Sequence, residues 1–175
     1  MKHFAAVFVF VLIVSMSVVH PVAAQSESEV QAVIEGFKEG DPGIQGWFSD
    51  AYGYVVFPSV GKAGFGIGGA RGKGLVYERG KLVGKSTLTQ VTIGFQFGGQ
   101  AFSEVIFFKD KVAFDEFIRE NFELGAQVSA VALTAGVSAD LAYNGGVAIV
   151  TATKGGLMYE ATVGGQKFSY DKLKD

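Results

Sequence analysis

From Tyr52 onward, large apolar residues alternate with small or polar ones, and this period of two constrains the fold more than any other feature. The run 91–98 reads VTIGFQFG. Such alternation is typical of β-strands, because successive side chains of a strand point to opposite faces of its sheet. Comparable strand signals occur at residues 54–57, 74–78, 103–108, 124–135, 146–153 and 156–163.

Three segments carry helical patterns instead. Ser26 and Glu29 form a capping box before an apolar stripe. Residues 44–51 favour a second short helix, and Asp110 is suited to cap a third. No helix alternates regularly with the strands. We therefore expect a β-rich α+β fold, a single domain built on an antiparallel, barrel- or sandwich-like sheet, with one or two N-terminal helices and one further helix near residues 110–121.

The stretch 64–74 reads GFGIGGARGKG and contains the spacing G-x-G-x-x-G. A dinucleotide-binding loop of this spacing joins a strand to a helix, and an acidic residue follows about 20 positions later. Here the strand alternation continues, no helical pattern follows before Tyr77, and position 89 is threonine. We expect no nucleotide and no cofactor, and we interpret the glycines as one strand face that another element or a ligand approaches closely.

The first 24 residues have the pattern of a secretory signal peptide. Lys2 precedes an apolar run, and Val22-Ala23-Ala24 resembles a cleavage site. We therefore expect residues 25–175 to form the mature domain, exported to the periplasm or the extracellular space and peripherally associated with a membrane. The chain has no cysteine, and its two histidines lie before the cleavage site. Disulfides, ordinary zinc sites and His-dependent catalytic sets therefore lack their residues in the mature part.

The charges are unevenly distributed. Without Lys2, 14 of the 15 Lys and Arg residues remain against 17 Asp and Glu, a net charge of −3. Between Lys62 and Lys85 there are six basic residues and one acidic residue, so this segment carries +5 and the remainder −8. An acidic mature chain disfavours nucleic-acid binding, whereas the basic segment suits anionic headgroups.

Three long stretches resemble the SYLF family of lipid-binding domains, and together they cover nearly the whole mature chain. Residues 51–108 read AYGYVVFPSVGKAGFGIGGARGKGLVYERGKLVGKSTLTQVTIGFQFGGQAFSEVIFF. Residues 122–139 read FELGAQVSAVALTAGVSA, and residues 154–170 read KGGLMYEATVGGQKFSY. The resemblance implies a β-rich domain that binds phospholipid through basic residues and an N-terminal amphipathic helix, and we expect no enzymatic activity. An exported protein does not ordinarily meet phosphoinositides, so the lipid class stays open.

Two sets of residues are candidates for contact with a lipid or membrane surface. The candidate lipid-binding residues are Lys62, Arg71, Lys73, Lys81 and Lys85. The candidate membrane contacts are Val30, Val33, Ile34, Phe37, Trp47 and Phe48. Each set has a structural alternative. The lysines can protect a sheet edge from pairing with other strands. The helical stripe, whose polar side is acidic, can pack on the core of the sheet.

Two other functions remain as alternatives. A signal peptide, alternating strands and sufficient length also fit a small outer-membrane β-barrel. Two carboxylates can hydrolyse glycosides, and Glu78 and Glu160 end the similar segments GLVYE and GLMYE. Segments that are apolar on both faces and a charged C-terminal tail argue against the barrel.

Overall fold

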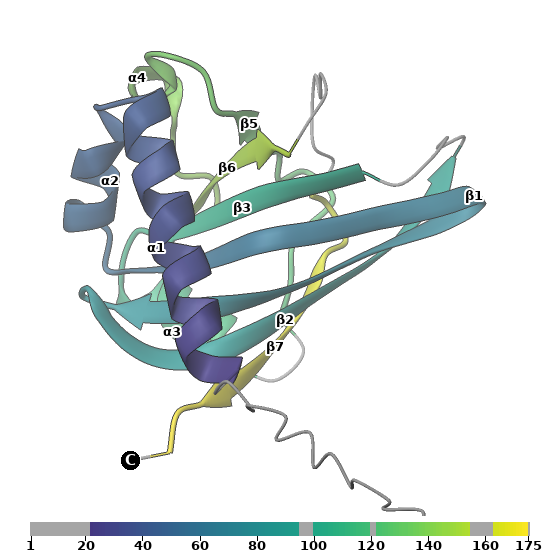
Figure 1. Cartoon of the computed structure of the whole chain (residues 1–175), viewed down its shortest axis with the longest axis horizontal. Helices are drawn as coiled ribbons and strands as arrows, with labels where there is room; N and C mark the ends of the chain where they lie inside the picture. Colours follow the sequence, from purple (N-terminus) through teal and green to yellow (C-terminus); the bar gives the residue numbers. More distant parts are fainter. Residues whose placement is uncertain (1–21, 95–99, 120–121, 155–162, 175) are drawn as a thin grey trace, which may run out of the picture.

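One curled sheet, a half-barrel, carries helices on its outer face and mostly irregular segments on its inner face (Figure 1). The computed structural model describes residues 22–94, 100–119, 122–154 and 163–174. Its elements are α1 (Val22–Gly40), α2 (Ile44–Asp50), β1 (Gly53–Glu78), β2 (Lys81–Gly94), β3 (Gln100–Phe108), α3 (Lys111–Phe117), β4 (Phe122–Glu123), β5 (Val131–Ala132), α4 (Val137–Asp140), β6 (Val147–Thr153) and β7 (Lys167–Lys172). The strand order is β4-β7-β2-β1-β3-β6-β5, and the pairing is antiparallel except between β5 and β6. The expected β-rich α+β fold is confirmed.

Strand β1 turns back on itself and supplies two neighbouring arms of the sheet. Its first part pairs with β3 and its last part with β2. A Cβ atom at Gly64 would overlap the backbone of Gly68, which places the reversal at these glycines. The backbone N–H of Arg79 donates to the carbonyl of Tyr52 at 2.9 Å, so the two ends of β1 lie side by side. The strand therefore forms a hairpin whose tip points away from α1 (Figure 1).

A glycine in the returning arm of β1 allows the two arms to approach closely. A Cβ atom at Gly74 would lie 2.6 Å from the carbonyl oxygen of Val56 and 2.7 Å from the ring of Phe57. Only hydrogen fits at this distance, because the nearest atom belongs to the backbone. At Gly74, the last residue of the glycine-rich stretch, the close approach expected from the sequence is thus made by the other arm of the same strand.

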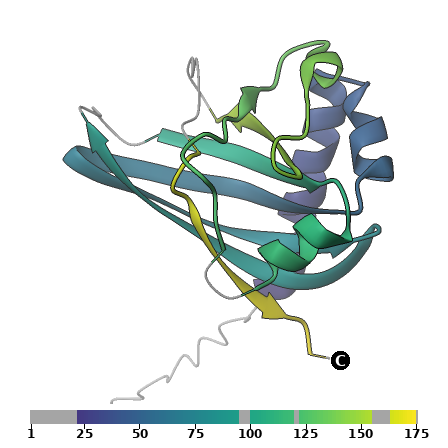
Figure 2. The same ribbon diagram turned by 180° about the vertical axis from the view of Figure 1, so that it is seen from behind.

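Both faces of the central strands are buried. On the outer face, α1, α2 and α4 cover Tyr54, Val56, Val105 and Phe107. On the inner face, α3 and the segments around Leu124 and Phe168 pack against the alternate residues of the same strands, as the reverse view in Figure 2 illustrates. The inner cluster consists of Val55, Phe57, Val60, Ala70, Val76, Leu88, Phe102, Ile106, Phe108, Ala113, Phe114, Phe117, Leu124, Ala130, Val147, Ile149, Val163 and Phe168.

The helices agree with the sequence patterns in position more closely than in length. Helix α1 begins at Val22, immediately after Pro21 and ahead of the capping box. Helix α2 matches the predicted 44–51 segment. The Asp110 side chain accepts the backbone N–H of Ala113 at 3.0 Å and so caps α3, but α3 ends at Phe117. No helix in the described ranges is long and apolar enough to span a bilayer.

The C-terminal half differs more from the predicted strands. Residues 124–135 were expected as one strand, but they contribute only β5 and the irregular chain before it. The reason is topological, since this segment connects β4 at one edge of the sheet with β5 at the other and cannot pair along its length. The sequence does not predict strand β7. Its segment KFSYDK has only one buried apolar residue, Phe168, and the other positions are polar, charged or partly exposed, so no apolar alternation is visible. Residues 156–162 of another predicted strand, and residues 1–21 of the predicted signal peptide, lie outside the described residues.

A buried polar pair lies within the inner cluster. Glu104 on β3 and Gln166 before β7 are both fully buried. The Gln166 amide Nε2 donates to Glu104 Oε2 at 3.0 Å, whereas Oε1 of each residue has no hydrogen-bond partner among the described residues. Burial raises the pKa of Glu104 to about 7, because the charged form is separated from water, and the bond from Gln166 offsets this only in part. Burial therefore keeps the carboxyl mostly neutral below about pH 7, whereas both forms are populated near pH 7.

This pKa makes the stability of the fold depend on pH. Glu104 ionises near its ordinary value of 4.5 in the unfolded chain and at about 7 in the folded one. The protonated carboxyl of Glu104 therefore stabilises the folded state fully below pH 4.5. This stabilisation is lost as the pH rises through about 7. At about 1.4 kcal/mol per pKa unit, the loss is on the order of 3 kcal/mol.

Replacement of Glu104 by Gln should remove this loss, because the amide is neutral at every pH. Urea unfolding measured from pH 5 to pH 8 should show the free energy of unfolding of E104Q rising relative to that of the parent protein. Glu116 on α3 is exposed, so E116Q is the matched control and should follow the parent. Parallel curves for E104Q and the parent would contradict the neutral assignment.

Replacement of Gly74 by Ala should destabilise the fold, because the added methyl would meet the Val56 carbonyl at 2.6 Å. We expect a loss of about 1–3 kcal/mol, as for other overpacked sites. Gly61 lies in the other arm of β1, and a Cβ atom added there would meet no atom within 4 Å. Equilibrium denaturation should therefore leave G61A near the parent, and equal losses for both variants would refute the close approach of the two arms.

Candidate functional site

A groove of about 640 Å³ lies on the outer face of the sheet, beside the N-terminal part of α1. Glu29 and Val30 of α1 form one side, and both arms of β1 contribute to the floor. Strand β2 and Asp171 of β7 complete the lining. The groove is therefore built where the helical cover of the outer face ends and the hairpin of β1 continues.

A β-bulge shapes the floor of this groove. The register of β1 against β3 shifts between Phe57 and Val60, and the intervening Pro58 and Ser59 line the groove. The buried hydroxyl of Ser103 donates to the carbonyl of Pro58 at 2.8 Å and holds the bulge in place. Proline lacks the N–H that a regular ladder requires, so its presence inside a strand is accommodated by such a bulge.

Three of the five candidate lipid-binding residues line the groove together. Arg71 and Lys73 alternate with buried residues on β1 and share the outer face with Leu75. Lys85 of β2 is directly opposite Leu75, and cross-strand partners occupy the same face. Within the described part of the chain, no carboxylate lies within 4.0 Å of any of these three basic groups. Their charges are available to an external anion.

The other two candidates lie elsewhere. Lys62 follows Val60 by two residues and is paired with Gln100, so it shares the inner face of the sheet. Lys81 is at the turn between β1 and β2, opposite Glu78. The basic segment of the sequence is thus divided between two faces and one end of the sheet.

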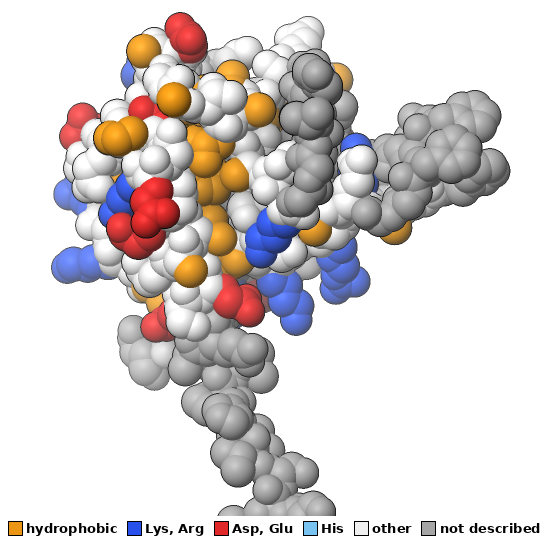
Figure 3. All heavy atoms as spheres, turned by 45° about the horizontal axis from the view of Figure 1, so that its top comes forward, with side chains coloured by type: hydrophobic (Ala, Val, Ile, Leu, Met, Phe, Trp, Pro, Cys, Tyr) orange, Lys and Arg blue, Asp and Glu red, His pale blue; other side chains and the backbone are white. Residues whose placement is uncertain are grey.

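Two acidic residues moderate the charge of the groove. Glu29 and Asp171 are exposed and line it with Arg71, Lys73 and Lys85. The three positive and two negative groups leave a net charge of +1. Figure 3 shows Lys and Arg side chains projecting at the lower right of one face of the molecule and also at its left side, with acidic side chains near both. Neither acidic residue is a lipid-site candidate in the sequence, because only the fold brings α1 and β7 next to β1.

The apolar stripe of α1 packs on the sheet. Val30, Ile34 and Phe37 are buried in the outer cluster, and Val33 is half-buried against it. In this structure the apolar stripe therefore packs on the core of the sheet, as the structural alternative proposes. Membrane contact by α1 stays a prediction that requires the helix to leave the sheet.

The two aromatic residues of α2 are also engaged within the protein. The indole Nε1 of Trp47 donates to the carbonyl of Ser138 in α4 at 3.2 Å, and its ring centroid lies 4.9 Å from that of Tyr143. Phe48 is buried, with its ring centroid 5.2 Å from that of Tyr54. Membrane contact by Trp47 and Phe48 likewise stays a prediction.

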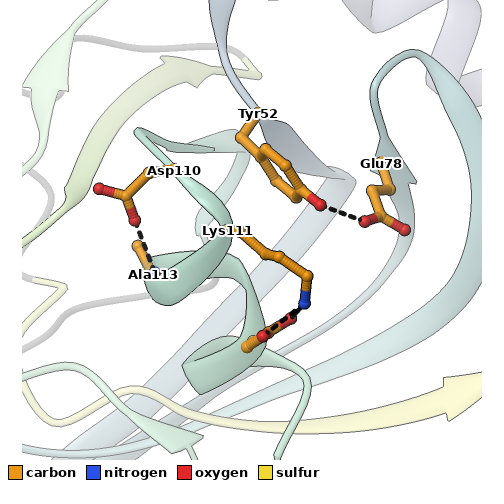
Figure 4. A network of polar contacts seen from close by, with 6 residues as sticks. Tyr52, Glu78, Asp110, Lys111 and Ala113 are labelled. Carbon is orange, nitrogen blue, oxygen red and sulfur yellow. Dashed lines mark hydrogen bonds and ion pairs between the residues drawn. The ribbon is translucent and has the colours of Figure 1, made fainter.

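The carboxylate considered for glycoside hydrolysis takes part in a structural contact. The hydroxyl of Tyr52 donates to Glu78 Oε1 at 2.7 Å, and this bond, with burial, raises the pKa of Tyr52 (Figure 4). The neighbouring Lys111 turns toward Asp115 of its own helix, at 2.6 Å. Glu160 lies outside the described residues, so the separation of the two glutamates is not defined. Among the described residues no cluster of His, Cys, Asp or Glu is placed to hold a metal ion.

Comparisons with known proteins agree with the sequence and the fold. Residues 89–174 match the family model Ysc84, described as "Las17-binding protein actin regulator". The chain is 33% identical over 144 residues to "Beta cell expansion factor A" of Aeromonas veronii, and the alignment covers 81% of this chain and 54% of that protein. The chain thus spans about half the length of this curated relative. By the family match and the similarity across most of its length, the chain belongs to the SYLF (Ysc84) family.

Proposed function

We propose that this protein binds anionic phospholipid at a membrane surface through the groove on the outer face of its sheet. Membership of the SYLF family suggests lipid binding in general terms. We propose more specifically that the lipid is anionic and that its headgroup binds in the groove. We further propose that the protein acts outside the cytoplasm after export and associates peripherally with the membrane.

The observation that carries the proposal is the grouping in one groove of three basic side chains that have no ion-pair partner among the described residues. Arg71, Lys73 and Lys85 come from two strands and converge on the same face. Each Lys or Arg near an anionic bilayer contributes roughly 1 kcal/mol, and this attraction falls off within a Debye length of about 8 Å at physiological salt. Because the chain as a whole is acidic, binding depends on orientation, with the groove facing the membrane.

Replacement of Arg71 and Lys73 together by Gln should weaken binding to vesicles that contain anionic phospholipid by on the order of 2 kcal/mol, about 30-fold. Flotation of the protein with liposomes, after removal of the predicted signal peptide, measures this partition. Lys109 and Lys174 are exposed and lie outside the groove lining, so K109Q with K174Q makes the same charge change and should have little effect. Equal losses for both double variants, or binding that is insensitive to salt, would count against the groove.

Removal of the two groove carboxylates should have the opposite effect. Glu29→Gln with Asp171→Asn raises the net charge of the groove from +1 to +3 and should strengthen binding to the same vesicles on the order of tenfold. Glu35 and Glu39 are exposed on α1 and do not line the groove, so E35Q with E39Q controls for the change in overall charge. If both pairs strengthen binding equally, net charge rather than the groove determines the affinity.

A further inference from the structure

The distal end of the β1 and β2 pair extends beyond the helices that cover the rest of the outer face (Figures 1 and 2). The two strands remain paired to this end, with Gly66 opposite Gly94 and Ile67 opposite Ile93. The backbone groups along this edge of β1 are therefore engaged in a ladder rather than left open to solvent. The end of the hairpin is a regular, projecting piece of sheet.

Two large apolar side chains are exposed at this end. Ile67 is 73% exposed and Val91 is 78% exposed. Gly69 is opposite Val91 in the register, so Ile67 and Val91 are diagonal neighbours on one face. Among the described residues the only other large hydrophobic side chain exposed to this degree is Val112, on α3. Apolar surface in water carries a free-energy cost that burial would remove.

The same face of β1 carries the basic side chains of the groove. Ile67, Arg71 and Lys73 are separated by even numbers of residues, so they point to one side of the strand. A strand rises about 3.3 Å per residue, which places Arg71 about 13 Å behind Ile67 along the hairpin. A bilayer has about 5–8 Å of headgroup region on each side of its hydrocarbon core. An inclined hairpin can therefore hold Arg71 among headgroups while Ile67 reaches the acyl chains.

We propose that the tip of this hairpin inserts Ile67 and Val91 into the hydrocarbon boundary of the membrane whose headgroups the groove contacts. This inference rests on the proposed function and adds an apolar anchor to it. The basic groups next to the apolar ones identify a lipid surface as the partner, because both contacts then form with one bilayer. The paired backbone suits the insertion, since unpaired N–H and C=O groups are costly in hydrocarbon.

The absence of cysteine from the chain permits a direct test of depth. Ile67→Cys and, as a matched exposed control, Val112→Cys are labelled with an environment-sensitive fluorophore and mixed with vesicles of phosphatidylglycerol and phosphatidylcholine. The label at position 67 should shift to the blue and be quenched by nitroxides on the lipid acyl chains, while the label at position 112 should stay in water. A label at position 67 that stays in water on vesicle-bound protein overturns the inference and leaves the proposed function intact.

Substitution gives a second measurement. Ile67→Ser with Val91→Ser should lower partition to the anionic vesicles on the order of tenfold, whereas Val112→Ser should change it less than about twofold. All three side chains are exposed, so the melting temperatures should stay close to that of the parent. Failure of the parent protein to bind any vesicle would refute both proposals together. A blue shift at position 67 that appears without vesicles and grows with protein concentration would identify a second copy of the chain as the occupant and overturn the membrane assignment.

Discussion

The rest of the structure depends on the burial of both faces of the central strands. Residues 54–57 of β1 and 105–108 of β3 are apolar at every position, so each face of the sheet requires a cover. Helices α1, α2 and α4 provide it on the outer side, and α3 with the C-terminal segments provides it on the inner side. The cover ends before the sheet does. Farther along the strands the sequence becomes glycine-rich and charged, so burial is no longer required there. The groove and the projecting hairpin lie in this uncovered part of the sheet.

The fold class could be predicted from the sequence because it depends on local periodicity. The alternation of residues, the Asp110 cap and the apolar stripe of α1 each act within a few residues, and each corresponds to an observed element. The reversal of β1 was not predicted, since its strand alternation continues through Gly64 and Gly68 without a conventional turn sequence. The course of residues 124–135 depends on which sheet edges they connect, and that information is not local.

The candidate site was predictable only in part, for the same reason. Even spacing alone places Arg71 and Lys73 on one face, but the position of Lys85 depends on the register of β2 and that of Lys62 on the reversal of β1. Glu29 and Asp171 enter the groove from opposite ends of the chain. The proline at position 58 is a local signal from which the bulge could have been predicted. Because α1 is occupied with covering the sheet, the strands rather than the N-terminal helix are the surface that we propose for lipid.

The buried carboxyl of Glu104 also has a consequence for the way the chain assembles. Its partner Gln166 comes from the C-terminal part of the chain, so the burial of Glu104 depends in part on the docking of that part. At neutral pH the glutamate is ionised in the unfolded chain, whereas in the folded protein the protonated and the ionised forms are both populated. Closure of the inner face therefore takes up protons, and the equilibrium between the open and the closed core is linked to the pH of the compartment in which the chain folds.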